Sequence, residues 1–334
     1  MRYPTKTSKR KKYLIISLLT IVGIALCIPV FLFIKKLKDP IIPALKAVPE
    51  SAVCLLEVKN VHGLYEKMKT KNLIWQELQG LDFFRELDNK IRNIDSIIKE
   101  NEELLETLKT NYLYIAWVPD RNKYSLLFTI NLLGPHRENI IDKFIRKNFS
   151  SGKTITSYKF LDNEIFQIYS HKKFICSYTV SKGIFIISES TGVIENSLSA
   201  LLTKICFDSD PLFTQLHAFA GKKVDANFFI RNQYFDKLLS SYFNKNINKQ
   251  IKLISISGEM GAFDLTLKND ELIIAGYLIS GDTGQFLKKV FGSQSPQQNQ
   301  LTSICPYNTA LMYYWGIHKP LQYIKDYNSF MKQK

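Results

Sequence analysis

The longest hydrophobic run of the chain lies near its start and extends from Tyr13 to Ile34 without a charged residue. As a helix it would be about 33 Å long, enough to cross a hydrocarbon core of about 30 Å. A buried core helix is rarely apolar on every face over such a length. A cleaved signal peptide has a shorter apolar region that ends at small residues, whereas this run ends at Lys35 and Lys36. The pattern therefore predicts an uncleaved transmembrane signal anchor over residues 13–34.

Basic residues stand on both sides of this segment. Six precede it and three follow it: Arg2, Lys6, Lys9, Arg10, Lys11, Lys12, then Lys35, Lys36 and Lys38. The lysines after the segment argue for the opposite orientation, but the larger group favours a cytoplasmic N-terminus by the positive-inside rule. We expect residues 1–12 to be a basic cytoplasmic tail and the main domain to be periplasmic or otherwise extracytoplasmic. The chain is then a single-pass protein of the inner (cytoplasmic) membrane, with the lipid bilayer as a partner through residues 13–34.

Beyond the anchor, residues 35–46 contain two prolines and predict a short stalk, and residues 47–292 alternate between strand and helix patterns. Strand patterns occur at 52–58, 112–118, 124–132, 164–170, 173–180, 183–189, 225–230, 260–267 and 271–280. Helical patterns occur at 61–79, 81–109, 136–149, 191–204, 209–220, 233–243 and 282–292, with Ser190 and Asp208 as expected caps. Short hairpin connections between most strands predict an α+β fold, preceded by the transmembrane helix. Its mainly antiparallel sheet would carry helices packed on one face.

The helical pattern from Leu81 to Lys109 is the longest of this domain. Its apolar residues follow alternating steps of three and four, interrupted at Asn101: Leu87, Ile91, Ile94, Ile98, Leu105 and Leu108. Such a seam is typical of a coiled coil, but three heptads are few. We expect the helix to pack against the sheet of its own domain, and a homo-oligomer built through this helix stays open.

A polar linker at 293–300 separates this domain from residues 301–334, which repeat an earlier pattern. The segments "VPESAVCLLEVKNVHGL" (48–64) and "CPYNTALMYYWGIHKPL" (305–321) both have a proline, a Ser/Thr-Ala step, a strand-like run and a His and Leu that begin a helical pattern. Residues 301–334 therefore predict the start of a second repeat copy. Either the chain is a shortened form of a longer two-copy protein, or this strand and helix dock on the first domain and complete an open sheet edge. We expect residues 301–334 to dock on the first domain in the folded state.

Several stretches resemble a family of uncharacterised bacterial envelope proteins, which are single-pass and carry a duplicated domain of unknown function. The similar stretches are "IPALKAVPESAVCLLEVKN", "GIFIISESTGVIENSLSALL", "DPLFTQL" and "FDLTLKNDELIIAGY". The resemblance covers most of residues 40–330. Familiar members are longer, with a second half that matches the first, and this chain departs from them there. The resemblance implies no activity, cofactor or catalytic residue.

The net charge of +15 suggests a nucleic-acid binder until the charge is located. The nine basic residues that flank the anchor account for much of it, since 36 basic against 30 acidic residues remain without them, a net charge of +6. That diffuse excess gives no phosphate-binding face, so we expect no nucleic acid as a partner. The hydrophobic share of 46% and the charged share of 22% are those of a globular protein.

No motif of the chain predicts a reaction. The five histidines (His62, His136, His171, His217 and His318) form no metal-binding pattern, and phosphate-cradling and nucleophile-elbow motifs are missing from the sequence. We therefore expect no cofactor and assign no catalytic, cofactor-binding or metal-binding residue. His62 and His318 recur at matching repeat positions, where a local hydrogen bond at a helix start is the expected role. Four cysteines lie outside the anchor, and their pairing stays open: Cys54, Cys176, Cys206 and Cys305. Cys54 and Cys176 lie in apolar strand patterns and are expected as free thiols.

Aromatic residues make up 13% of the chain, and residues 313–315 and 228–229 place them on adjacent strand positions, hence on both faces. A sheet covered on both sides explains this pattern, and an exposed aromatic docking face is the alternative. The sequence thus favours a membrane-anchored envelope protein with a non-catalytic binding or scaffolding role, with other envelope proteins or peptides as open partners. The alternative is an envelope enzyme whose site is assembled from sequence-distant residues. A deep pocket with convergent polar groups would favour the enzyme, and a flat apolar patch or open sheet edge would favour association.

Overall fold

The computed structural model describes residues 42–132, 143–147, 152–242, 257–280, 288–306 and 314–332, together with residues 141, 309 and 312. The predicted anchor at 13–34, the tail before it and most of the expected helix at 136–149 lie outside these residues. Within the described part, none of the helices combines the length and the apolar character that a membrane span requires.

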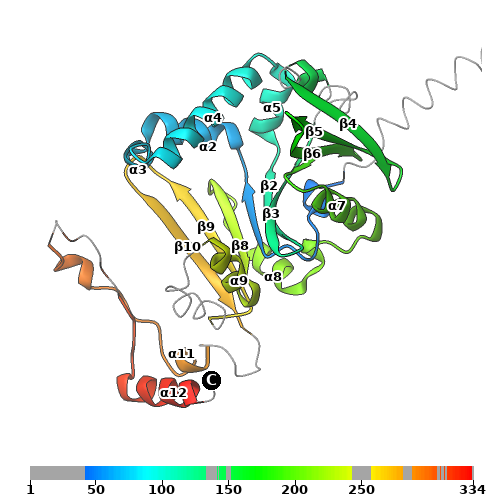
Figure 1. Ribbon diagram of the computed structural model, residues 1–334. Helices are drawn as coiled ribbons and strands as arrows, with labels where there is room; N and C mark the ends of the chain where they lie inside the picture. Colours follow the sequence, from blue (N-terminus) through cyan, green and yellow to red (C-terminus); the bar gives the residue numbers. More distant parts are fainter. Residues whose placement is uncertain are drawn as a thin grey trace, which may run out of the picture.

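The described strands form one antiparallel sheet in the order β10-β9-β8-β1-β2-β3-β7-β6-β5-β4 (Figure 1). The strands are β1 (Cys54–Val58), β2 (Leu113–Asp120), β3 (Lys123–Asn131), β4 (Lys153–Phe160), β5 (Asn163–Ser170), β6 (Lys173–Ser181), β7 (Ile184–Ser188), β8 (Ala226–Arg231), β9 (Met260–Leu267) and β10 (Leu272–Ile279). The α+β fold with a large antiparallel sheet is therefore confirmed. The expected hairpins β2–β3, β5–β6, β6–β7 and β9–β10 are all present.

The two edges of the sheet differ in character. The edge strand β4, "KTITSYKF", carries lysines, threonines and a serine, so it lacks the hydrophobic alternation that marks a buried strand and was not predicted. The opposite edge strand β10, "LIIAGYLI", pairs with β9, and seven of its eight residues are exposed. Charged residues protect the first edge against pairing with other chains, whereas β10 has none.

The described α-helices occupy places that the pattern predicts, with two breaks, whereas the short helices η1, η2 and η4 were not predicted. The helices are η1 (Ala44–Ala47), α2 (Val61–Lys71), α3 (Leu73–Leu78), α4 (Asp82–Lys99), α5 (Glu102–Thr110), α7 (Thr191–Thr203), η2 (Phe207–Ser209), α8 (Pro211–Phe219), α9 (Asn232–Tyr242), α11 (Lys288–Phe291), η4 (Leu301–Ser303) and α12 (Pro320–Lys332). The expected helix at 81–109 is two helices, because the Asn101 side chain accepts a hydrogen bond from Leu104 N (3.1 Å) and caps α5. Because of the break, the buried leucine of α5 is Leu104, which is not one of the predicted seam residues. Asn72 caps α3 in the same way and divides the pattern at 61–79.

Helices cover both faces of the sheet, which corrects the expectation of one covered face. Leu55 belongs to a core cluster with α7 and α8, and its neighbour Cys54 belongs to a cluster with α9. Adjacent strand residues point to opposite faces, so these clusters lie on opposite sides. A third cluster includes Leu104 of α5 and Ile187 of β7. Ile186, the neighbour of Ile187, belongs to the cluster with α7 and α8, so the third cluster lies on the opposite face, together with the α9 cluster. Of the aromatic pair, Phe229 is buried in the first cluster, and Phe228 is partly buried against the α9 cluster on the other face.

The start of the folded domain lies before residue 47. Ala44 and Ala47 are fully buried, and Asn131 holds the segment by accepting from Ala44 N (2.8 Å) and donating to Ile42 O (2.8 Å). Ala44 and Leu45, expected as part of the stalk, thus belong to the core of the domain.

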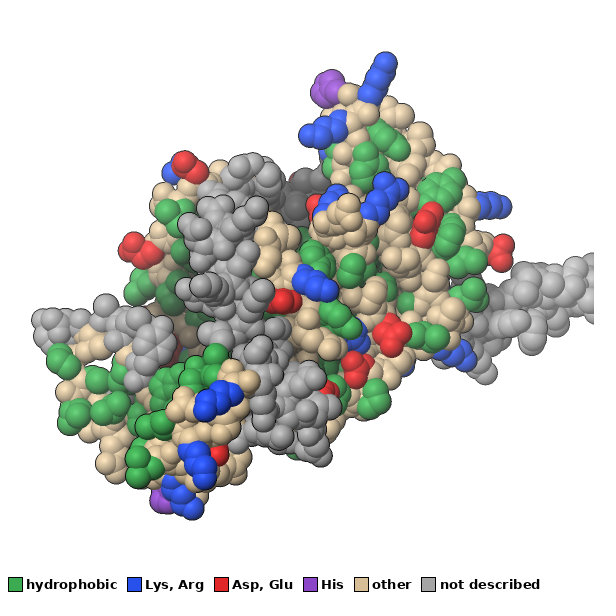
Figure 2. Space-filling model, turned by 60° about the horizontal axis from the view of Figure 1, so that its bottom comes forward, with side chains coloured by type: hydrophobic (Ala, Val, Ile, Leu, Met, Phe, Trp, Pro, Cys, Tyr) green, Lys and Arg blue, Asp and Glu red, His purple; other side chains and the backbone are tan. Residues whose placement is uncertain are grey.

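The C-terminal residues form a separate lobe in the view of Figure 1, with α12 below the sheet. Phe291 of α11 contacts Trp315 (ring centroids 5.9 Å apart) and Tyr323 of α12 (5.6 Å). α12 begins where the second repeat predicts a helix, but residues 314–317 belong to no strand. Hydrophobic side chains lie on the surface of this lobe, at the lower left of Figure 2. Docking of the second unit on the sheet edge stays a prediction.

Candidate functional site

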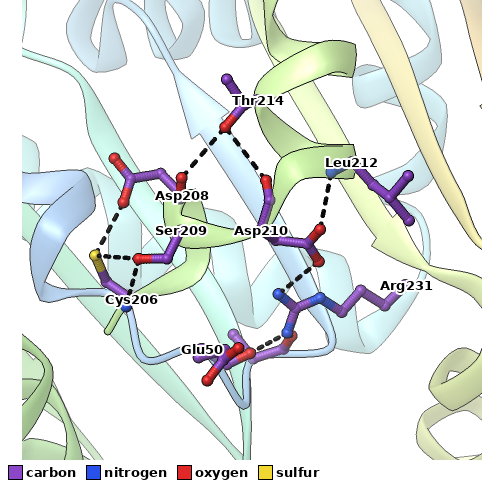
Figure 3. A network of polar contacts seen from close by, with 9 residues as sticks. Glu50, Cys206, Asp208, Ser209, Asp210, Leu212, Thr214 and Arg231 are labelled. Atoms are coloured by element: carbon purple, nitrogen blue, oxygen red, sulfur yellow. Dashed lines mark hydrogen bonds and ion pairs between the residues drawn. The ribbon is translucent and has the colours of Figure 1, made fainter. Parts of the chain in front are cut away.

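A buried arginine joins three segments at one end of the sheet. Arg231 is the last residue of β8, and its side chain is 10% exposed. Its guanidinium donates to Asp210 Oδ2 (3.0 Å), to Ala52 O (3.2 Å) and to Glu50 O (Figure 3). The guanidinium carbon also lies 4.5 Å from the centre of the Phe207 ring. Arg231 thereby fixes the loop before β1 to the start of α8.

Asp210 uses both carboxylate oxygens in this network. One accepts from Arg231, and the other accepts from Leu212 N (2.9 Å) and caps α8. The sequence pattern placed this cap at Asp208, which lies instead in the short helix η2. Pro211 explains why the cap is Asp210, because a proline is well suited to the first helical position and poorly suited to the helix interior.

Cys206 lies at the far side of the same network. Its thiol donates to Asp208 Oδ1 (2.9 Å), and Asp208 also forms an ion pair with Lys46 Nζ (2.8 Å). Burial raises the pKa of the Cys206 thiol, and the hydrogen bond to Asp208 adds to this effect. A protonated, buried thiol is a poor nucleophile, so this cysteine serves structure. No disulfide joins any two of the four cysteines outside the predicted anchor, which are all free: Cys54, Cys176, Cys206 and Cys305.

A hollow opens beside Arg231 and continues past α9. Its first part measures about 600 Å³ and is lined by Glu50, Ser51, Arg231, Tyr234 and Lys237, among others. The second part measures about 440 Å³ and shares Pro119, Tyr124 and Lys237 with the first. We call the two parts together the hairpin groove, because they lie between the β2–β3 turn and α9. These volumes are in the range of small-molecule sites, and both parts are open to solvent.

The second part of the hairpin groove is positively charged. Arg121, Lys123 and Lys237 line it, and within the described residues none of the three side chains forms an ion pair. Tyr124 and Ser240 add hydroxyl groups, whereas the Ser241 hydroxyl donates to Leu238 O (2.6 Å). Burial, and to a lesser extent the charge of Asp236, raise the pKa of Tyr124, so its hydroxyl stays protonated.

The chain places these groups by ordinary local rules. Arg121 has a φ of 55° in the tight turn between β2 and β3, a left-handed conformation that two-residue hairpin loops require. Lys237 lies on α9, whose buried Leu238 packs against the β1 and β8 side chains Cys54 and Ile230. The sequence assigned no residue to a site, so every residue of the groove is an addition from the structure. Charged residues in a turn and on a helix resemble any solvated surface until the fold brings them together.

The described histidines do not gather at this groove. His217 forms a 3.1 Å hydrogen bond with the buried Glu57, and His171 lies in the β5–β6 turn. His318 lies beside Gln297 in the C-terminal lobe. His62 approaches Asp95 on α4 at 3.7 Å, so its contact is long-range and not the local hydrogen bond expected from the sequence.

Comparison with protein-family models and with curated proteins gave no match. Among solved structures, "Structure of crystal form I of TP0453" is similar at 13% identity and a TM-score of 0.39, covering 72% of this chain and 80% of that chain. "Structure of crystal form III of TP0453" is similar at 13% identity and a TM-score of 0.40, covering 72% and 81%. TM-scores this low carry no argument about the fold or the function of this chain.

Proposed function

We propose that this protein is a membrane-anchored, extracytoplasmic binding protein whose hairpin groove takes ligands bearing carboxylate or phosphate groups. The observation that carries the proposal is a set of three cations, Arg121, Lys123 and Lys237, around one hollow of about 440 Å³. None of them has an ion-pair partner in the part of the chain that the structure describes. Arginine binds such groups through two parallel hydrogen bonds, and lysine binds them as a point charge. The adjoining hydroxyl groups would orient the bound anion.

Binding fits the groove better than catalysis does. Of the described residues that line it, none is a histidine or a cysteine. Of its two carboxylates, Asp210 is already held by Arg231 and by the α8 backbone, and Glu50 is exposed to solvent. A nucleophile needs an adjacent base to become reactive, and no described lining residue offers that pair.

Removing the three charges should weaken the binding of an acidic probe at least tenfold. A fluorescein-labelled hexaglutamate peptide is titrated with the wild-type protein and with the Arg121→Asn, Lys123→Gln, Lys237→Gln variant. Asparagine is chosen at Arg121 because it tolerates the left-handed conformation. Fluorescence anisotropy gives the Kd, and raising the salt concentration should weaken binding to the wild type because exposed charges are screened.

A matched control removes the same charge elsewhere. Lys172, with a φ of 64°, lies in the β5–β6 turn, and Lys173 and Lys223 are exposed. The Lys172→Asn, Lys173→Gln, Lys223→Gln variant should bind the peptide as the wild type does. Equal losses in both variants would mean that only the net charge matters, and an unchanged Kd in the groove variant would refute the site.

The membrane anchor of the proposal depends on the 22-residue uncharged run at 13–34. A phosphatase that folds only outside the cytoplasm, fused after residue 334, should be active in intact cells. The Leu19→Arg, Val22→Arg variant should lose that activity, because each arginine opposes insertion by about 2.5–3.5 kcal/mol. The Leu19→Ile, Val22→Leu variant should keep it. A wild-type fusion that stays inactive would overturn the orientation.

Membership of the duplicated envelope family is part of the same proposal. It is supported by the resembling stretches between residues 40 and 330 and by the expected anchor. The second repeat copy at 301–334, and any oligomer built through α4, remain predictions.

A further inference from the structure

Two helices bring three possible metal ligands together, far from the hairpin groove in the sequence. His62 and Glu66 are four residues apart and so lie on one side of α2, and Asp95 of α4 faces them. One ligand atom from each of the three residues lies within 4.8 Å of the others. Their side chains are half-buried, at 20%, 35% and 12% exposed, so solvent ions have access.

The centre of this cluster already attracts a positive charge. Lys99 Nζ lies 2.8 Å from Asp95 Oδ2 and 3.1 Å from Glu66 Oε1. Because the lysine side chain is 43% exposed, its ammonium group can leave the cluster for water without crossing the core.

We infer that His62, Glu66 and Asp95 form a zinc-binding site that Lys99 occupies in the absence of metal. An imidazole nitrogen with two carboxylate oxygens is a donor set that Zn²⁺ takes, with a fourth position left for water. Ligand distances of about 2.0–2.2 Å require donor atoms about 3.3 Å apart, so the side chains must close by at most about 1.5 Å. Two carboxylates balance the charge of Zn²⁺, and the ammonium group is then in excess and is displaced.

The metal would join the start of α2 to the second half of α4. His62 lies in the first turn of α2, and Asp95 lies one turn before the end of α4. A ligand that binds the folded state alone also stabilises it, so zinc should raise the melting temperature of the protein. This inference is independent of the anionic ligand proposed for the hairpin groove.

The test measures zinc affinity on the full chain in detergent, purified without a remaining histidine tag. Competition with a chromophoric chelator gives the Kd. Lys99→Met removes the competing cation and should tighten zinc binding at least tenfold. His62→Ala in the Lys99→Met background should weaken binding at least tenfold, and His171→Ala, at an exposed turn, should change nothing.

A second pair of measurements separates binding from misfolding. Glu66→Gln keeps the shape of a partly exposed side chain and should also lower the affinity of the Lys99→Met protein. Zinc should raise the melting temperature of Lys99→Met protein but not that of Lys99→Met, His62→Ala protein. The site does not exist if Lys99→Met binds zinc no more tightly than the wild type, or if His62→Ala behaves like His171→Ala.

Discussion

Arg231→Met is expected to lower the free energy of unfolding by about 3–5 kcal/mol, the range seen when one partner of a buried ion pair is removed. The Arg231 side chain is 10% exposed and that of Asp210 is 21% exposed. Without the guanidinium, Asp210 loses its counter-ion, and the carbonyl oxygens of Glu50 and Ala52 lose a hydrogen-bond donor. Urea unfolding followed by tryptophan fluorescence measures the loss.

Two further variants give this prediction its control. Lys237→Met, on the exposed side of the same hollow, should change the free energy of unfolding by less than about 0.5 kcal/mol. Adding Asp210→Asn to Arg231→Met should recover part of the loss, because the uncompensated charge is gone while asparagine still caps α8. If Arg231→Met costs no more than Lys237→Met, then Arg231 does not hold this end of the sheet together.

Phe213→Ala should lower the free energy of unfolding by a similar amount, about 3–5 kcal/mol, which is typical of a buried phenylalanine. Phe213 of α8 is 2% exposed, and its ring lies 4.8 Å from that of Phe229 and 5.0 Å from that of Phe207. The truncated side chain would leave a cavity between α8 and the sheet. Because Asp210 caps this helix, we expect the loss of packing to loosen the Arg231 network as well.

Phe219→Ala is the matched control for this substitution. Phe219 ends the same helix but is 66% exposed, so its truncation removes little buried surface. Its effect should stay within about 0.5 kcal/mol, measured by the same urea titration. Equal effects of the two substitutions would mean that Phe213 does not occupy the core position that the structure assigns to it.

Local sequence patterns predicted most of the elements that neighbouring residues form. The β9–β10 hairpin follows from two apolar runs around "KND", and α7 follows from its apolar spacing. Ser190 stands at the expected cap position of α7, but its side chain makes no capping hydrogen bond. The pattern failed at β4, because an edge strand buries little and needs no hydrophobic alternation. It also failed at the α8 cap, where two aspartates compete and the adjacent Pro211 favours Asp210.

The amino-acid order alone thus determined most of the antiparallel hairpins and most of the helices, because these depend on residues close together in the chain. It also predicts an anchor at 13–34, a prediction that depends only on the length and hydrophobicity of this run. Only the tertiary structure decided that Lys237 lies beside the β2–β3 turn, that Arg231 lies under the α8 cap and that His62 faces Asp95. These contacts join residues far apart in sequence, and the strand order and helix packing that create them leave no local periodicity to detect.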